Sequence, residues 1–292
     1  MKSKIGSIVL ISLGILLAGC GKKGTEEISG ETATTVEESV AANLTENDTE
    51  NLAESQTVEV LEAGPAIIDI ENPSWDYYIE DEAVSVASPL KLVQLTESAN
   101  AITDTEKWFE KNDLSLKAES DERYGCEIYS PYDSEQCDIQ VTDREKGESF
   151  TLHFEGFRYA DDFAEEDEPF VEQNIQYAQI EDGILYFSIG HLTYAKFSPH
   201  NAYVAAVDLA EKKLLWKSEP LVSNAYNFVI AGNVLLCGYG FTEEPDYLYQ
   251  LDLTSGKVIG EIPLKTRADY LILKDNILYV RTYNTDYTFQ VE

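Results

Sequence analysis

The stretch Ala206–Trp216, AVDLAEKKLLW, returns in altered form as Gln250–Gly260, QLDLTSGKVIG. Each copy has an aspartate at its third position, followed by a polar turn and a second apolar run. An aspartate at such a place can bond backbone N–H groups two residues on, and Ser255-Gly256 gives the freedom that a tight turn needs. The pattern therefore predicts two strands joined by a turn, present twice in one chain.

Two more extended segments precede each of these turns. EDGILYFSIG, AGNVLLCGYG and KDNILYVRTY each place a turn of Asp, Gly or Asn before an apolar strand, and a β-rich run precedes each turn. Four strands in about 40 to 50 residues is typical of a propeller blade. The sequence therefore predicts an all-β fold, a small β-propeller of about four to five four-stranded blades.

The last repeat ends before its fourth strand. Its final segment, DYTFQVE, stops at Glu292, and an unpaired strand edge invites aggregation. Propellers fill such a place with a strand from the other end of the chain. We therefore expect an N-terminal segment between Ala66 and Leu95, such as AIIDI or PLKLVQL, to close the last blade.

Residues 65–292 form the predicted propeller-like domain, with an irregular part at 65–172 and regular repeats at 173–292. The segment TDTEKWFEKND, 103–113, predicts one short helix, with Thr103 as its cap, Glu106 completing a capping box, and Trp108 and Phe109 toward the core. The strands expected in this part lie near 114–118, 127–130, 138–142 and 150–154.

The N-terminus has the pattern of an export signal. Lys2 and Lys4 precede an apolar run and the small-residue sequence LAGC, so residues 1–19 are predicted to be a secretory signal peptide. LAGC resembles the lipobox of bacterial lipoproteins. That resemblance implies a lipid on Cys20 that anchors the exported chain to the cell membrane on its extracytoplasmic face. The alternative is an ordinary signal peptide with an incidental cysteine.

Residues 20–64 are rich in Glu, Thr, Ser, Ala and Asn, and we expect them to form a disordered acidic tether because they contain too little apolar surface to fold. The whole chain has a formal net charge of −33. Nucleic-acid recognition needs a basic face, so nucleic acid is excluded as a partner. Cationic partners, divalent metals and neutral sugars stay open.

The repeat resembles the pyrroloquinoline-quinone (PQQ) type of propeller repeat, Ala-x-Asp-x-x-Thr-Gly-Lys-x-x-Trp. The matching residues are Ala206, Asp208, Lys213 and Trp216 in the first copy and Asp252, Gly256 and Lys257 in the second. The resemblance implies that Trp216 packs one blade against the next. Quinone-dependent dehydrogenases of this type are much longer, so no cofactor is expected here. Lipoproteins with such repeats can act as scaffolds in envelope assembly.

In a four-stranded blade, the connections after strands two and four lie on one face. Here the connections after strand two are long and aromatic-polar: GHLTYAKFSPHN, GYGFTEEPD and TYNTD. Binding residues concentrate on long loops of rigid scaffolds, so we place any ligand or partner site there. The candidate residues are His191, His200, Asn201, Tyr239, Glu243, Asp246, Tyr283, Asn284 and Asp286. The alternative is that these loops only cap the sheet ends.

No catalytic or metal-ligating set stands out. The chain has 3 histidines and neither an H-E-x-x-H nor a G-x-S-x-G motif, and the acidic run within 161–168 lacks the spacing of a calcium loop. The favoured function is therefore a non-catalytic binding or scaffold module for an envelope protein or a cell-wall ligand. The alternative is a carbohydrate-active hydrolase or lyase that uses paired carboxylates on the same face.

The cysteines after Cys20 allow two interpretations. Cys126 and Cys137 flank a predicted hairpin with Pro131 and Asp133 in its turn, so the two thiols either face each other as a disulfide or stay unpaired. Cys237 lies within an apolar strand and is expected to be a small buried residue.

Overall fold

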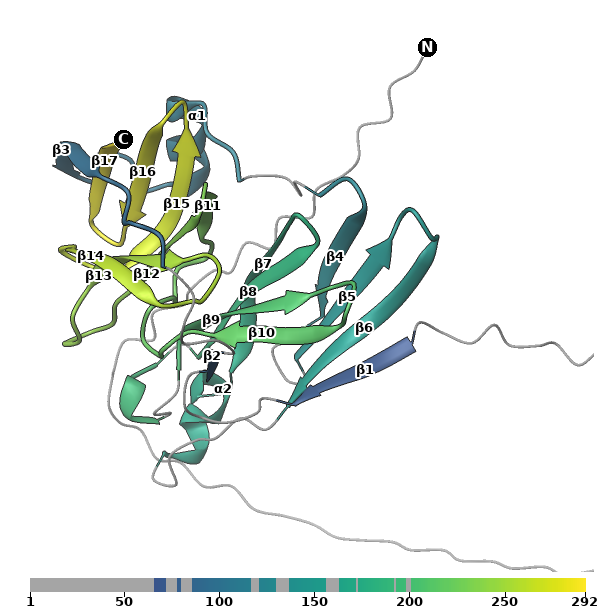
Figure 1. Cartoon of the computed structure of the whole chain (residues 1–292). Coiled ribbons are helices and arrows are strands. Elements are labelled where there is room, and N and C mark those ends of the chain that lie inside the picture. The colour runs from purple at the N-terminus through teal and green to yellow at the C-terminus, as the bar shows by residue number, and fades with distance from the viewer. Residues whose placement is uncertain are drawn as a thin grey trace, which may run out of the picture. The chain divides into compact units, whose positions relative to one another are not determined.

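The repeats of the sequence form four separate β-sheets in a computed structural model of the chain (Figure 1). The structure describes residues 66–71, 78–79, 86–116, 121–129, 137–155, 163–171, 173–191, 193–197 and 201–292. The expected signal peptide, Cys20 and the tether to residue 64 lie outside the described residues.

Each sheet is called a blade here and is numbered along the chain. Blade 1 has the order β1-β6-β5-β4, with bounds Ala66–Glu71, Glu148–Glu155, Cys137–Asp143 and Tyr124–Tyr129. Blade 2 has the order β2-β10-β9-β8-β7, with bounds Tyr78–Ile79, Lys213–Lys217, Tyr203–Asp208, Ile184–Gly190 and Asn174–Glu181.

Blade 3 has the order β11-β12-β13-β14, with bounds Val229–Ala231, Val234–Tyr239, Tyr247–Asp252 and Val258–Pro263. Blade 4 has the order β15-β16-β17-β3, with bounds Ala268–Lys274, Ile277–Thr282, Thr285–Val291 and Leu92–Ala99. The helical elements in the described part are α1 (Thr105–Asn112), α2 (Glu168–Val171) and the 3-10 turns η1 (Glu165–Asp167) and η2 (Ala195–Phe197). The expected all-β, propeller-like class is confirmed, with four-stranded blades except in blade 2, where β2 adds a fifth strand.

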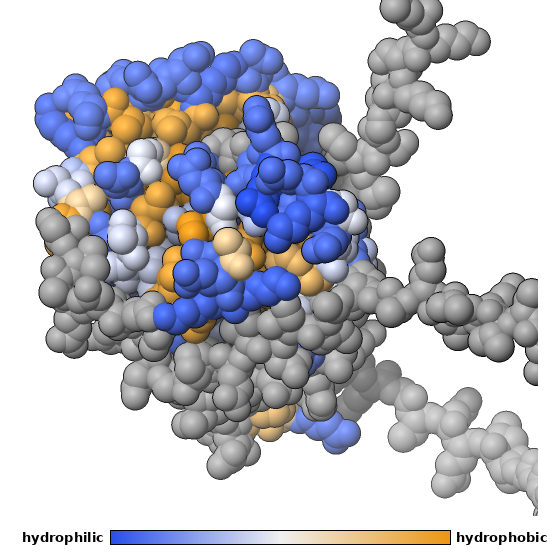
Figure 2. Space-filling model, turned by 45° about the vertical axis from the view of Figure 1, so that its right-hand side comes forward, coloured by the Kyte–Doolittle hydropathy of each residue, from blue (hydrophilic) through white to orange (hydrophobic). Residues whose placement is uncertain are grey.

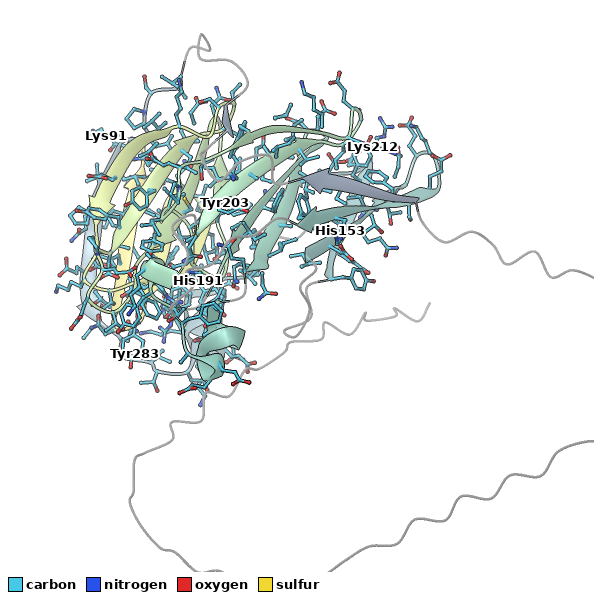
Figure 3. All side chains as sticks on the ribbon, turned by 90° about the horizontal axis from the view of Figure 1, so that it is seen from below. Lys91, His153, His191, Tyr203, Lys212 and Tyr283 are labelled. Atoms are coloured by element: carbon cyan, nitrogen blue, oxygen red, sulfur yellow. The ribbon has the colours of Figure 1, made fainter. Side chains whose placement is uncertain are left out.

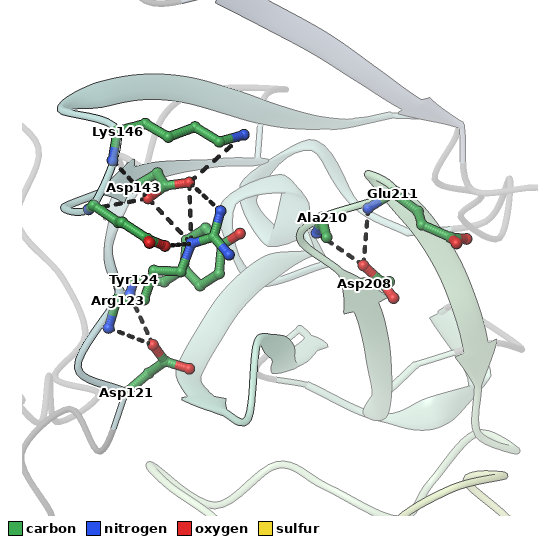
Figure 4. A network of polar contacts seen from close by, with 9 residues as sticks. Asp121, Arg123, Tyr124, Asp143, Lys146, Asp208, Ala210 and Glu211 are labelled. Carbon is green, nitrogen blue, oxygen red and sulfur yellow. Dashed lines mark hydrogen bonds and ion pairs between the residues drawn. The ribbon is translucent and has the colours of Figure 1, made fainter.

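The repeated aspartates have the local role that the sequence predicts. Asp208 Oδ1 accepts hydrogen bonds from the backbone N–H groups of Ala210 and Glu211 at 2.8 and 2.9 Å. Asp252 Oδ1 accepts from the backbone of residues 254 and 255 at 3.2 and 2.8 Å. Asp143 makes the same two-bond turn in blade 1, as Figure 4 shows beside the turn of Asp208. Asp208 and Asp252 thus turn the chain from the third to the fourth strand of their blades, and Asp143 turns it from β5 to β6 in blade 1.

An N-terminal strand closes the last blade, as expected. Strand β3 pairs antiparallel with β17 from Thr285↔Ala99 to Val291↔Leu92. Two segments were expected as candidates for this strand, and PLKLVQL, residues 89–95, contributes to it. The other, AIIDI, forms β1, which pairs in parallel with β6 in blade 1.

Buried apolar clusters join the blades in chain order. One cluster contains Ile139 and Leu152 of blade 1 with Leu185 and Phe187 of blade 2, and a second joins blade 3 to blade 4. Between blades 2 and 3 lies Trp216, which is 1% exposed. A Cβ placed on Gly256 of blade 3 would meet the Trp216 ring at 2.3 Å, so the glycine is required for this contact. Trp216 therefore packs one blade on the next, as the repeat implies.

Helix α1 covers the face of blade 4 that points away from blade 3. Phe109 lies edge-on to Tyr270 of β15 at 5.3 Å, and the Arg281 guanidinium lies 5.3 Å from the ring of buried Trp108. Arg281 Nη2 also donates to the carbonyl of Ile102 at 2.6 Å. Among the described residues, no buried apolar cluster joins blade 4 to blade 1, and α1 occupies this face instead.

Two local expectations need correction. The N-cap of α1 is Asp104, whose side chain accepts from Lys107 N, and not Thr103, because the chain becomes helical only at Thr105. A strand was expected near 114–118, but residues 114–116, the described part of that segment, are not a strand. The inner strand of blade 1 is β4, which begins at Tyr124.

The hairpin register also separates the two cysteines of blade 1. Cys126 lies opposite Val141, whereas Cys137 lies four residues away along β5, about 13 Å at the rise of a strand. A disulfide needs Cα atoms less than about 7 Å apart, so the first of the two interpretations, a disulfide across the hairpin, does not fit this register. Cys237 is fully buried, and burial raises the pKa of its thiol, as expected for a small core residue.

Candidate functional site

The short turns and the long connections lie at opposite ends of the blades. In Figure 3, Lys91 and Lys212 lie toward one end of the sheets, and His191 and Tyr283 lie toward the other. Lys212 belongs to the turn after Asp208, and Tyr283 to the connection between β16 and β17. The end that carries His191 and Tyr283 is called the long-loop face below.

Two of the candidate residues support the loop of blade 2 from inside. His191 and Asn201 are 2% and 0% exposed, and Asn201 Oδ1 accepts from the His191 backbone N–H at 2.6 Å. Thr193 N donates to His191 Nδ1 at 3.2 Å, so that nitrogen is an acceptor and the ring is neutral. Burial lowers the pKa of His191 to about 4. These side chains hold the loop in place, and His200 lies outside the described residues.

The buried histidine makes stability depend on pH. Because the folded-state pKa lies below the ordinary value of 6.5, the unfolded chain binds a proton first as pH falls. The stabilising effect is complete above pH 6.5 and is lost progressively down to about pH 4, in total roughly 3 kcal/mol. We expect His191→Gln to lose less stability than the wild type between pH 7 and pH 4 in urea titrations. A parallel fall in both proteins would contradict this assignment.

Glu244 connects the loops of blades 2 and 3. Its carboxylate accepts from the backbone N–H of Ala195 at 2.9 Å and from the hydroxyl of Tyr239. Tyr194 and Phe241 meet edge-on at 5.0 Å beside this contact. Tyr239, one of the candidate binding residues, is 3% exposed, and its hydroxyl supports the loop from inside. Sequence reasoning missed Glu244 because nothing in TEEPD distinguishes it from Glu243.

The polar residues after β16 are engaged within blade 4. Asn284 Oδ1 accepts from the hydroxyls of Thr266 and Thr285 at 3.0 and 2.8 Å. Asp286 forms an ion pair with the buried Arg281 at 3.2 Å, and burial raises the pKa of Asp286. Both residues therefore fix the turn that carries Tyr283.

A groove of about 760 Å³ brings together the remaining candidates, Glu243, Asp246 and Tyr283. Its walls are residues 241–246, after β12, and residues 265–267, which connect blade 3 to blade 4. The sequence contained a signal for the second wall, because LKTR follows a fourth strand and such connections lie on this same face. Because this connection is short, the length of the loops did not indicate it as part of a site. The groove has the volume of an ordinary ligand site.

Tyr283 stands exposed at this groove. Its side chain is 80% exposed, although its backbone is fixed by Tyr283 N donating to the Arg267 carbonyl at 3.1 Å. Figure 2 shows another view of the surface, on which hydrophilic residues predominate and apolar residues form a band between them. Single exposed apolar residues are common on proteins. An exposed aromatic residue on a hydrogen-bonded backbone beside a groove is more informative, because aromatic side chains are enriched at binding sites.

The two cations of the groove are paired with carboxylates, but two of its own carboxylates are not paired. Lys265 pairs with Glu97 at 2.5 Å, and Arg267 pairs with Asp269 at 2.7 Å. Within the described residues, the carboxylates of Glu243 and Asp246 have no hydrogen-bond or ion-pair partner. Burial raises the pKa of Asp246, Arg267 opposes that shift, and neighbouring Glu244 adds to it. The groove thus offers hydrogen-bond acceptors that have no donor among the described residues.

Asp246 occupies its place because Gly240 has no side chain. A Cβ on Gly240 would lie 1.9 Å from Asp246 Oδ1. Gly240 is itself held by Asn224, whose amide donates to its carbonyl at 2.8 Å and accepts from its N–H at 3.2 Å. The position of the Asp246 carboxylate is therefore built into blade 3.

A second cavity, of about 530 Å³, is lined by the inner strands β7, β11 and β15 and by residues after α1. Among the described residues it contains one carboxylate, Asp113, which pairs with Lys274 at 2.7 Å. A glycosidase needs two carboxylates facing the sugar bond. The lining described here does not supply that pair.

The acidic run within 161–168 is only partly described, with Glu165 and Glu166 exposed. No group of three or more His, Cys, Asp or Glu residues arranged to hold a metal is present in the described part of the chain. In that same part, no helix has the length and apolar character needed to cross a membrane.

Comparison with known proteins adds little to this picture. No family model matches the chain, and no curated protein matches it. A crystal structure of BamB from Moraxella catarrhalis is similar over 56% of this chain and 58% of that chain, with 11% sequence identity and a TM-score of 0.28. The chain therefore spans little more than half the length of that neighbour. The fold assignment rests on the blades themselves.

Proposed function

We propose that the chain is a binding or scaffold module of the cell envelope that engages its partner through the groove on the long-loop face. The observation that carries the proposal is the groove of about 760 Å³ with the 80% exposed ring of Tyr283 beside it. Strands β12 and β13 flank one wall and β14 and β15 flank the other, which supports a site that is formed before any ligand arrives. Preformed sites lose less entropy on binding, which favours affinity.

The lipobox supports a membrane location for this module. A lipid on Cys20 would hold the propeller at the membrane, with residues 20–64 as the tether between them. We expect Cys20→Ser to move the protein from the membrane fraction to the soluble fraction. Unchanged fractionation would remove the anchor from the proposal but would leave the groove in place.

The binding function is tested by capture from solubilised envelopes. We expect Tyr283→Ala to reduce the recovery of specific partners or cell-wall fragments by about tenfold or more, because central aromatic residues contribute about 2 kcal/mol or more to interfaces. Tyr129→Ala is a matched control, since Tyr129 is 50% exposed on β4 of blade 1. Equal recoveries with wild type and both variants would contradict the proposal.

A further inference from the structure

The carboxylates of the groove favour a ligand that donates hydrogen bonds and carries positive charge. Among the described residues, Glu243 and Asp246 provide carboxylates without a hydrogen-bond or ion-pair partner, and the carboxylate of Glu244 is bonded only by neutral donors. The cations beside them, Lys265 and Arg267, already face Glu97 and Asp269. Ionised carboxylates only accept hydrogen bonds. A sugar hydroxyl both donates and accepts, whereas a cationic group only donates.

The aromatic residue at the groove distinguishes between cations. Tyr283 presents an exposed ring on a fixed backbone. A guanidinium is planar, stacks on aromatic faces and offers five N–H donors, while an ammonium is a compact and strongly hydrated charge. Unpaired carboxylates next to an exposed ring therefore match a guanidinium better than an ammonium.

The charge of the whole chain acts in the same direction. A net charge of −33 attracts cationic partners over distances comparable to the Debye length and repels acidic ones. Long-range attraction alone selects no site, but it raises the encounter rate of a basic segment with every part of the surface. The groove then supplies the local complementarity.

We propose that the groove binds an arginine side chain of a partner polypeptide, with its guanidinium between Asp246 and Glu243 and stacked on Tyr283. This proposal rests on the proposed function and specifies the chemistry of its ligand. Arg267 forms an ion pair with Asp269 and lies 5.4 Å from the Tyr226 ring, so it forms a wall of the site, and its charge acts on Asp246 without an ion pair between the two side chains.

The test uses three peptides that differ at one residue. Each is a short Gly-Ser peptide with a central arginine, lysine or citrulline, and binding to the full chain is measured by titration at low ionic strength. Citrulline has nearly the shape of arginine but carries no charge. We expect the arginine peptide to bind most tightly, the lysine peptide several-fold more weakly, and the citrulline peptide at least about tenfold more weakly.

Variants separate local binding from general attraction. Asp246→Asn and Tyr283→Ala should each weaken arginine-peptide binding, the former by about tenfold. Glu211→Gln removes one charge from the short-turn end, at the turn shown in Figure 4, and should leave binding unchanged. Equal loss in Glu211→Gln and Asp246→Asn would overturn the proposal, because it would mean attraction by net charge alone.

Two further results distinguish this inference from the function on which it rests. If the citrulline peptide binds as tightly as the arginine peptide, the inference is overturned, although Tyr283→Ala can still abolish envelope capture and so uphold the proposed function. If Asp246→Asn and Tyr283→Ala both bind the arginine peptide like the wild type, the groove is not the site of this ligand.

Discussion

A chain that starts at residue 100 should melt at a temperature about 10 °C or more below that of a chain that starts at residue 86. The difference between the two truncations is the segment that contains β3. This strand covers the open edge of β17, and Leu90 and Leu92 pack on the cluster between blades 3 and 4. Its loss exposes an unpaired edge and an apolar surface together.

Contacts to blade 3 add to this effect. The Gln250 side chain accepts from Leu90 N at 2.8 Å and donates to the Leu90 carbonyl at 3.1 Å, and Ala87 N donates to Asp252 at 2.6 Å. Since domains are stable by only about 5–15 kcal/mol, we expect the melting temperature to fall by about 10 °C or more. Differential scanning calorimetry on both truncations measures it. Matching transitions would show that blade 4 does not depend on β3.

Trp216→Ala should destabilise the protein by about 3–5 kcal/mol, the usual effect of deleting a fully buried ring. The ring fills the interface between blades 2 and 3, where Phe228 and Leu251 are also buried. Urea titration measures the change, and Tyr283→Ala serves as the control because an exposed ring contributes little. A loss below about 1 kcal/mol would contradict the role of Trp216 between the blades.

The contact with Gly256 allows a stricter test of the same interface. Gly256→Val places a side chain where the Trp216 ring lies, and at φ +69° it also strains the turn. In the Trp216→Ala background the steric part of this penalty should disappear, so the two substitutions should be less than additive. Full additivity would mean that the two residues do not meet.

The sequence was most informative where a residue acts on its own neighbours. The turns at Asp208 and Asp252 and the helix containing Trp108 follow from local chemistry, and the closing strand follows from a missing partner. The helix cap was misplaced by one residue because Thr103 and Asp104 are both good caps, and only the backbone selects between them.

The candidate site was predicted less well, for a physical reason. Loop length identifies a face, but it does not tell which side chains point outward. His191 and Asn201 are buried and hydrogen-bond each other across the loop. Asp286 forms an ion pair with Arg281 of the neighbouring strand. Glu243, Asp246 and Tyr283 do line one groove, yet its other wall, 265–267, comes from the connection between blades. Only the packing of blade 3 on blade 4 brings these walls together.

The central claim is that the partner is held at the groove of the long-loop face. An aromatic photo-crosslinking residue, which keeps a ring in place of Tyr283, tests it most directly in the full chain in intact cells, with the same residue in place of Tyr129 as the reference. We expect a discrete adduct from position 283 that weakens when Asp246→Asn is added, and none from position 129. The same adducts from both positions, or an adduct from position 129 alone, would contradict the claim.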